Sequence, residues 1–503
     1  MKFFIFLYSF FLLSFSLVAG PIEKFQDRPK LIVVIVFDQF RSDYLTRFEK
    51  KFLPAEKKGF QFLMKGGAYF PDAEYDILQC MTGPGHATIM TGSYPYLNGI
   101  PLNEWNDGEH RVYCTEDPSE KTLIGTKDIH LGTSPKLMIG TTVGDEIKNA
   151  GYSSKSVSIA LKDRASILMG GHRADLALWY DNEAKAWTSS SYYLKDLKNP
   201  DWVLKLNADL KKNPCDLVKP CAADMTTTAS IEALKTFKLG QHDGVDVLTI
   251  SYSGHDYAGH KYGPNSSEME DVTLSEDKNL SLLLSEVEKN VPGGLKNVVV
   301  VLTADHGIAP TPESLQNSGI ESGVIDDAEI TKELEERLNK KFGNALNESW
   351  ITMHYDFNFF LNRKTLKDRK VSATRIEDEI KSYLLSIHGV SYVVTKTEIE
   401  QKKLPPGMFE RKIEKTYFPG RAGDVIAIFK PFFIEHGAAT THLSGYSYDR
   451  TVPIILYGKN IRSGVYARQI DVVDLAPTLS FLVGTIPPSL SEGHLITEAI
   501  DLP

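Results

Sequence analysis

Short hydrophobic segments alternate along the chain with segments whose apolar residues recur at helical spacing. The expected core strands are Leu31–Phe37, Lys155–Leu161, Val245–Tyr252 and Val298–Leu302. Apolar strands without polar alternation are typical of a parallel sheet covered by helices on both faces. The expected helices between them include Thr142–Ala150, Met225–Phe237 and Leu274–Val287. The alternation predicts an α/β protein, a three-layer α/β/α sandwich with a mostly parallel central sheet.

The segment between His306 and His442 has a different pattern. It contains a charged helix, a strand, a second helix and a second strand, expected at Asp327–Phe342, Ile351–Leu361, Ser372–Ile387 and Val390–Thr395. We interpret residues 310–430 as an inserted α+β cap subdomain. The main sheet is expected to resume at Asp424–Phe429 and Val452–Gly458, before a final helix at Val472–Val483.

The N-terminus has the pattern of an export signal. Lys2 precedes an uncharged run from Phe3 to Ala19, and the small residues Ala19 and Gly20 end it. The run is shorter than the roughly 20 residues of a spanning helix and contains serines, although an uncleaved anchor is the alternative. Residues 1–20 are therefore predicted to be a signal peptide. The catalytic domain, residues 21–503, is expected in the periplasm or outside the cell, without stable membrane insertion.

Composition narrows the possible partners. The chain has 503 residues, 42% of them hydrophobic, and a net charge of −9. This charge argues against nucleic acid as a partner, and an anionic substrate would need local positive charge such as metal ions.

The four cysteines fit two disulfides in an exported chain. Cys215 and Cys221 flank a short loop, and Cys80 with Cys114 would follow by elimination. The alternative is that some cysteines stay free and buried.

Acidic and histidine residues follow three of the expected strands. Asp38 follows the first strand, Asp256 and His260 follow the third, and Asp305 and His306 follow the fourth. The carboxyl ends of parallel strands share one edge of a sheet, so these side chains are expected to converge. Each alone is more often a turn or capping residue. Together they indicate a metal site, and carboxylate and imidazole ligands suit zinc.

Thr82 lies in a glycine- and proline-rich turn just before an expected helix at Ile89–Thr91. The N-terminus of a helix favours anions, because its backbone N–H groups and dipole are positive. A threonine hydroxyl is a poor nucleophile unless a metal or a base activates it. Without metal ligands elsewhere, Thr82 would be read only as a helix cap.

The order Asp38, Thr82, Asp256-x-x-x-His260, Asp305-His306 and His442 resembles that of the alkaline phosphatase superfamily. Two longer motifs resemble its type I phosphodiesterase and nucleotide pyrophosphatase group: Thr82-Gly83-Pro84-Gly85-His86-Ala87-Thr88 and Asp256-Tyr257-Ala258-Gly259-His260.

This resemblance implies two zinc ions. One would be bound by Asp256, His260 and His442. The other would be bound by Asp38, Asp305 and His306, with Thr82 as its neighbouring nucleophile. His86 and His255 are not expected to be ligands.

Asn103, Lys162 and Arg164 complete the expected site. This set resembles the threonine-nucleophile, phosphate-irrepressible alkaline phosphatases of bacteria. An arginine fork and a lysine suit the dianion of a phosphate monoester. Without the resemblance, Lys162 and Arg164 would be read as a solvated surface pair.

The resemblance implies an exported alkaline phosphatase that hydrolyses small phosphate monoesters through a phosphothreonine intermediate. The alternatives are a phosphodiesterase or nucleotide pyrophosphatase with the same metals and nucleophile, and a non-catalytic metal- or phosphate-binding protein. A sulfatase is not indicated, because Cys80 lacks the following x-Pro-x-Arg signature. The sequence leaves the physiological substrate and the oligomeric state open.

Overall fold

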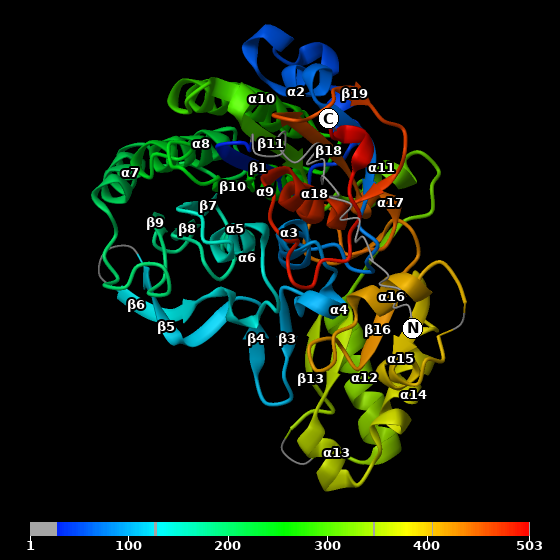
Figure 1. Cartoon of the computed structure of the whole chain (residues 1–503). Coiled ribbons are helices and arrows are strands. Elements are labelled where there is room, and N and C mark those ends of the chain that lie inside the picture. The colour runs from blue at the N-terminus through cyan, green and yellow to red at the C-terminus, as the bar shows by residue number, and fades with distance from the viewer. Residues whose placement is uncertain (1–27, 125–127, 346–347, 405, 502–503) are drawn as a thin grey trace, which may run out of the picture.

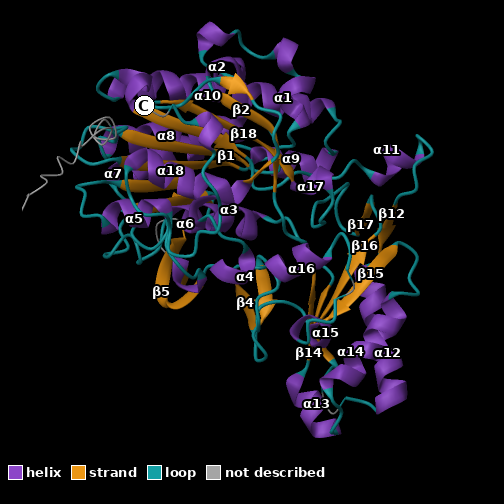
Figure 2. Cartoon of the chain, turned by 45° about the vertical axis from the view of Figure 1, so that its right-hand side comes forward, coloured by secondary structure: helices purple, strands orange, loops and turns teal. Residues whose placement is uncertain are grey.

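The computed structural model describes residues 28–124, 128–345, 348–404 and 406–501. A large sheet with helices on both faces forms one lobe, and a smaller lobe, residues 310–435, projects from it (Figures 1 and 2). The expected signal peptide, residues 1–20, lies outside the described residues. Among the described residues, no helix has the length and apolar character needed to cross a membrane.

The centre of the main sheet is parallel, as predicted. Its five parallel strands run in the order β11, β1, β10, β7 and β8, with bounds Val298–Thr303, Leu31–Phe37, Asp246–Tyr252, Ser156–Ala160 and Leu176–Asp181. Every residue of β1, β10 and β11 is buried. This explains why the three strands appear in the sequence as unbroken apolar runs.

Antiparallel strands flank this centre. Next to β11, β18 (Thr451–Gly458) pairs antiparallel with it and with β2 (Ala68–Glu74). At the other edge, β9 (Ala186–Thr188) pairs antiparallel with β8. Two short strands, β19 (Gly464–Val465) and β20 (Ile470–Asp471), extend β2 in parallel.

Two helical layers cover the main sheet (Figures 1 and 2). One layer contains α3, α5, α6 and α18, with bounds Thr82–Thr91, Val143–Asn149, Asp163–Gly170 and Leu475–Val483. The other contains α2, α7, α8, α9 and α10, with bounds Phe60–Gly66, Asp201–Lys212, Cys221–Thr236, Gly254–Tyr262 and Ser267–Asn290. The three-layer α/β/α prediction is confirmed.

Helix α10 begins earlier than its apolar pattern predicted. The prediction started at Leu274, whereas the helix starts at Ser267. Ser266 caps it, because its side chain accepts a hydrogen bond from the Met269 N–H. The first turn carries Glu268 and Glu270, and acidic residues stabilise the N-terminus of a helix. They are not apolar, so a prediction from the spacing of apolar residues does not include this turn.

The small lobe has its own sheet and core. Its four antiparallel strands run in the order β13, β14, β16 and β15, with bounds Ile351–Tyr355, Asn358–Leu361, Val425–Phe429 and Val390–Thr395. Its main helices are α12, α13 and α14, with bounds Asp327–Phe342, Arg363–Arg369 and Ala373–Leu384. Leu334, Trp350, Phe359 and Ile376 are buried in its separate hydrophobic cluster. Two further strands, β12 (Gly323–Ile325) and β17 (Phe433–Glu435), pair with each other in parallel.

Two strand predictions in this lobe are wrong. The single strand expected at Ile351–Leu361 is a hairpin, because Asp356 and Phe357 adopt φ of 47° and 55° and reverse the chain. The strand expected to resume the main sheet, Asp424–Phe429, instead pairs with β14 and β15 in the small lobe. An apolar run has the same appearance in the sequence whichever sheet it joins.

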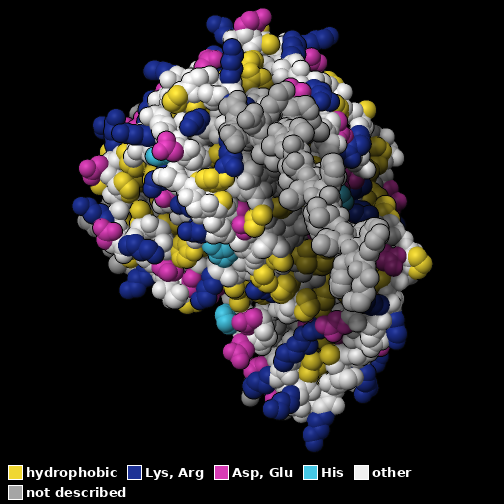
Figure 3. All heavy atoms as spheres, viewed as in Figure 1, with side chains coloured by type: hydrophobic (Ala, Val, Ile, Leu, Met, Phe, Trp, Pro, Cys, Tyr) yellow, Lys and Arg dark blue, Asp and Glu magenta, His cyan; other side chains and the backbone are white. Residues whose placement is uncertain are grey.

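Charged side chains of both signs are spread over both lobes on the face shown in Figure 3.

The predicted cysteine pairing is half correct. Cys215 and Cys221 form a disulfide. Cys80 and Cys114 are free and buried, which contradicts their expected pairing. Cys80 belongs to the main core, whereas Cys114 packs in a different cluster with Leu102 and Trp105. Pairing by elimination failed because it took no account of where each thiol packs.

This assignment predicts the outcome of thiol alkylation. Denatured without reductant, the chain should take up label on Cys80 and Cys114 alone, and reduction should add Cys215 and Cys221. Peptide mass spectrometry checks both states. Complete protection of Cys80 and Cys114 before reduction would show that they are paired after all.

Candidate active site

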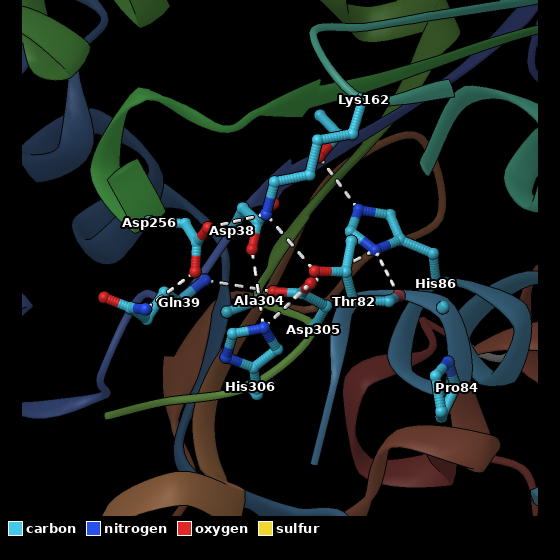
Figure 4. Close-up of polar contacts among 12 residues, drawn as sticks. Asp38, Gln39, Thr82, Pro84, His86, Lys162, Asp256, Ala304, Asp305 and His306 are labelled. Carbon is cyan, nitrogen blue, oxygen red and sulfur yellow. Dashed lines mark hydrogen bonds and ion pairs between the residues drawn. The ribbon is translucent and has the colours of Figure 1, made fainter. Parts of the chain in front are cut away.

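The predicted polar residues converge at the carboxyl ends of the central strands (Figure 4). Asp38 follows β1, Asp305 and His306 follow β11, and Asp256 lies in the first turn of α9 beyond β10. Gln39 adopts a φ of 68°, so the chain turns sharply just after Asp38. The parallel centre of the sheet thus positions the site.

One group of possible metal ligands contains Asp256, His260 and His442. Asp256 and His260 are four residues apart on α9 and share one helix face, with Asp256 Oδ1 3.2 Å from His260 Nε2. His442 comes from the loop before α17 (Ser447–Arg450), and its Nε2 lies 3.9 Å from the same oxygen.

The other nitrogen of each imidazole in this group contacts the backbone. His260 Nδ1 lies 3.1 Å from the Thr440 carbonyl oxygen, and His442 Nδ1 lies 2.6 Å from the Cys80 carbonyl oxygen. A carbonyl can only accept, so these contacts place the proton on Nδ1 and leave Nε2 free to bind a metal.

A second group contains Asp38, Asp305 and His306, all fully buried. His306 Nε2 lies 3.5 Å from Asp38 Oδ1 and 3.4 Å from Asp305 Oδ2, and its Nδ1 contacts the Gly307 carbonyl oxygen at 2.9 Å. The His306 and His442 rings stack with centroids 3.7 Å apart, so the two groups are adjacent.

The chemistry of both groups fits divalent metal ions. Each offers carboxylate oxygens and an Nε2 atom, the ligands that zinc prefers without cysteine. In the second group, Asp305 Oδ2 lies 3.2 Å from His86 Nδ1, whereas His306 Nε2 is buried and has no hydrogen-bond partner among the described residues. Buried polar atoms of this kind are costly unless a cation or another partner satisfies them.

Lys162 provides the positive charge that balances this site in the structure. Its Nζ lies 2.6 Å from Asp38 Oδ2, 2.6 Å from Asp256 Oδ2 and 3.2 Å from Thr82 Oγ1 (Figure 4). Burial lowers the pKa of Lys162, but Asp256 and Asp38 outweigh that effect and raise it overall. The ammonium group therefore stays charged.

The pKa values of two of these carboxyl groups are shifted in opposite directions, because their charged neighbours differ. Burial, with the negative charge of Asp305, holds the pKa of Asp38 well above its usual range. Burial also acts to raise the pKa of Asp256, but Lys162 and His260 outweigh it and hold this pKa well below its usual range. Such opposed shifts within one small site are typical of functional centres.

Thr82 is the first residue of α3, and its hydroxyl faces Lys162. The glycines beside it allow close approach of the helix to β11 and to Asn103. A Cβ at Gly85 would lie 2.4 Å from the Asp305 carbonyl oxygen, and one at Gly83 would lie 2.9 Å from Asn103 Oδ1. The glycine-rich sequence is therefore a packing requirement that places Thr82 beside the carboxylates.

Asn103 and Arg164 lie around this centre. Asn103 Oδ1 accepts a hydrogen bond of 2.8 Å from the Gly83 N–H, so its amide NH₂ group is turned to other partners. Arg164 Nη1 donates to Tyr113 Oη at 3.2 Å, and Tyr113 Oη donates to Asp163 Oδ1 at 2.6 Å.

Lys162 and Arg164 are not a solvated surface pair. Lys162 is the N-cap of α6, Arg164 lies in its first turn, and Lys162 is 6% exposed. Lys162 reaches Thr82, whereas Arg164 lies beside Tyr113. Both border one open cavity of about 390 Å³, together with Tyr113, Trp179 and Tyr257.

The two histidines that were not predicted as ligands make structural contacts. His86 Nδ1 lies 2.8 Å from the Thr82 carbonyl oxygen, and its Nε2 lies 2.8 Å from Ser251 Oγ. His255 pairs with Glu276 at 3.0 Å and packs against Phe40.

Sequence reasoning missed three residues around the site. Gln39 donates from Nε2 to Asp256 Oδ1 at 2.6 Å and from its backbone N–H to Asp305 Oδ1 at 3.0 Å. Tyr113 contacts Arg164, and Tyr355 of the small lobe contacts the Asn103 side chain. Gln39 could have been noticed beside Asp38, but no local pattern brings Tyr113 or Tyr355 to the site.

The fold, together with two groups of possible metal ligands, defines this chain as a member of the alkaline phosphatase superfamily. The profile of the type I phosphodiesterase/nucleotide pyrophosphatase family matches residues 32–442, and the chain belongs to this family.

The individual relatives include bacterial phosphatases. The chain is 31% identical to alkaline phosphatase PafA of Elizabethkingia meningoseptica, over 94% of this chain and 95% of the relative. It is 30% identical to alkaline phosphatase PhoV of Synechococcus elongatus, over 94% and 93% respectively. The crystal structure of wild-type PafA superposes with a TM-score of 0.86 at 30% identity, covering 94% of this chain and 99% of that one.

The loop after His442 contains a carboxyl group that should make stability depend on pH. Asp449 is buried, and its Oδ2 accepts hydrogen bonds from Ser444 N at 2.9 Å and Ser444 Oγ at 2.5 Å. Burial raises the pKa of Asp449 from 3.8 to about 7.

Because the folded pKa of Asp449 is raised, its stabilising contribution is complete below the unfolded pKa of 3.8 and is lost as pH rises through about 7. Asp449→Asn should therefore gain free energy of unfolding relative to the wild type between pH 5 and pH 8, by at most about 3 kcal/mol, because the folded pKa of about 7 lies about two pH units above pH 5. Chemical denaturation at both pH values measures this, with the exposed Asp209→Asn as control. An equal difference at both pH values would contradict the assignment.

Proposed function

We propose that this chain is an alkaline phosphatase, a hydrolase of small phosphate monoesters. The observation that carries the proposal is a pair of cationic side chains, one beside Thr82 and the other sharing a cavity with the first. Lys162 contacts the Thr82 hydroxyl directly, and Arg164 borders the same cavity. The similarity to PafA and PhoV over most of each chain supports the same activity.

The proposed cofactors are two zinc ions. Asp256, His260 and His442 would bind one, and Asp38, Asp305 and His306 would bind the other, beside Thr82. Bound there, the ions would supply positive charge to the attacking and leaving oxygens of an in-line displacement.

The side chains of the chain itself account for the rest of the proposed mechanism. The Thr82 hydroxyl loses its proton to solvent, its Oγ1 forms a bond to phosphorus, and the bond from phosphorus to the ester oxygen breaks. A phosphothreonine results, and the alkoxide that leaves takes a proton from water. Lys162 remains protonated, so it stabilises the Thr82 alkoxide electrostatically rather than removing its proton. Water then displaces Thr82 from phosphorus and releases inorganic phosphate.

Three groups are proposed to hold the non-bridging phosphate oxygens. Lys162 acts as a point charge, Arg164 offers a planar fork, and Asn103 offers its amide NH₂. Tyr113 fixes Arg164, because the same hydroxyl contacts both Arg164 and Asp163. This arrangement favours a dianionic monoester, whose transition state distributes charge over three equatorial oxygens.

The remaining expectations belong to the same proposal. Residues 1–20 act as a signal peptide, and the enzyme works in the periplasm or outside the cell. The segment 310–430 serves as a cap, which Tyr355 supports by reaching Asn103 from the small lobe. The family's diesterase activity is the second candidate, because it uses the same metals and nucleophile.

The nucleophile assignment predicts the effect of one substitution. Thr82→Ala should lower the turnover of p-nitrophenyl phosphate by at least about 10³-fold, because no other hydroxyl replaces Oγ1. Thr228→Ala, an exposed threonine on α8, is the matched control and should retain full activity. Circular dichroism should show both variants folded. A folded Thr82→Ala variant with activity near that of the wild type would rule out this nucleophile.

The phosphate clamp predicts a difference between substrates. Arg164→Ala should lower kcat/KM for a monoester by about 10- to 100-fold, since a charged hydrogen bond contributes about 1.5–3 kcal/mol. The loss for bis-p-nitrophenyl phosphate should be much smaller. Arg173→Ala, an exposed arginine bonded to Asn149, is the control. Equal losses on both substrates would contradict the role of Arg164.

The proposed activity itself is tested with the mature, zinc-loaded protein at alkaline pH. We expect p-nitrophenyl phosphate to be hydrolysed in strong preference to bis-p-nitrophenyl phosphate. A chelator should abolish the activity and added zinc should restore it. Preference for the diester would place the enzyme with the diesterases, and folded, zinc-containing protein without turnover would indicate a binding protein.

A further inference from the structure

A third group of possible metal ligands lies in the small lobe, apart from the two groups of the active site. It contains Asp327, His354 and Glu435, whose ligand atoms all lie within 4.8 Å of one another. Asp327 is the first residue of α12, His354 is in β13, and Glu435 ends β17. Three separate elements therefore deliver one ligand each.

The geometry centres on the His354 imidazole. Its Nε2 lies 3.2 Å from Asp327 Oδ2 and 3.3 Å from Glu435 Oε1. The side chains of Asp327, His354 and Glu435 are 24%, 16% and 15% exposed. The group is thus sheltered but open enough for water molecules to complete a coordination shell.

The charges around this imidazole do not balance. A fourth acidic side chain, Asp356, contacts the Glu435 carboxyl group, and two carboxyl groups share such a contact only with a proton or a cation between them. In the part of the chain that the structure describes, no Lys or Arg forms an ion pair with Asp327, Asp356 or Glu435. A cation bound here would offset the negative charge of this acidic group.

We propose that Asp327, His354 and Glu435 bind a third zinc ion, with Asp356 beside it as a further carboxylate. One imidazole with carboxylates suits Zn²⁺ better than Ca²⁺ or Mg²⁺, which prefer oxygen ligands alone. The ion has a structural role. It joins α12, β13 and β17, and it neutralises the carboxylate pair of Glu435 and Asp356.

The position of this site connects it with the catalytic lobe. Asp356 lies in the β13–β14 turn directly after Tyr355, which contacts Asn103. Asp356 and Glu435 also line a small cavity of about 40 Å³ that His442 lines as well. An ion held by Glu435 and His354 therefore fixes the turn that brings Tyr355 to the active site.

Metal stoichiometry of the full-length mature protein tests the proposal. After zinc loading and removal of free zinc, elemental analysis should find one equivalent fewer in the double variant His354→Ala/Glu435→Gln than in the wild type. The control is His388→Ala/Glu321→Gln, a pair of the same chemistry in the same lobe, 3.7 Å apart and 76% and 62% exposed. It should keep the zinc content of the wild type.

Two further measurements keep the test decisive. His354→Gln, a milder change, is measured alongside in case the double variant does not fold, and it should also lose one equivalent. The variant Asp256→Asn/His260→Ala alters the proposed catalytic metal group. It should still bind the one equivalent of zinc assigned to the small lobe. This distinguishes a failure of the third site from a failure of the proposed function.

Thermal unfolding gives a second readout. Zinc should raise the melting temperature of the wild type more than that of His354→Gln. Equal zinc content in the wild type and in folded His354→Gln would overturn the proposal, and it would leave the contacts of His354 with Asp327 and Glu435 as structural contacts only.

Discussion

The mutual repulsion of three buried carboxylates is the constraint on which the rest of this structure depends. Asp38, Asp256 and Asp305 are at most 4% exposed and lie at the ends of neighbouring strands. Charges buried this closely are unfavourable unless cations neutralise them. Lys162 contacts two of them, and the imidazoles of His86, His260, His306 and His442 surround them. The site is therefore built to hold positive charge, which is what a phosphate ester requires.

The same constraint explains the architecture around the site. A parallel sheet brings the ends of β1, β10 and β11 to one edge, so a single fold delivers all three carboxylates. The glycines of α3 let Thr82 approach that edge without a steric clash. The backbone carbonyls of Cys80 and Thr440 orient the imidazoles of His442 and His260. Each of these features fixes a polar group before substrate arrives, which is the main physical source of rate enhancement in such sites.

The features that the sequence could predict are local. The strand ends carrying Asp38 and Asp305, and the four-residue spacing of Asp256 and His260, are visible as short patterns, and the structure brings these residues together. The contacts that could not be predicted join distant segments. The hydrogen bond of Tyr113 with Arg164, the contact of Tyr355 with Asn103 and the membership of β16 in the small lobe depend on pairing that leaves no local pattern. The unpaired state of Cys80 and Cys114 has the same origin, since packing decides which thiols meet.

The central claim is that Thr82 attacks phosphorus and is itself displaced by water in a second step. The stereochemical course at phosphorus tests this most directly. A phosphate monoester made chiral with oxygen isotopes is hydrolysed in the presence of an alcohol acceptor, and the configuration of the transferred phosphoryl group is determined. Two in-line displacements through phosphothreonine predict net retention. Net inversion would show a single direct attack and would contradict the account.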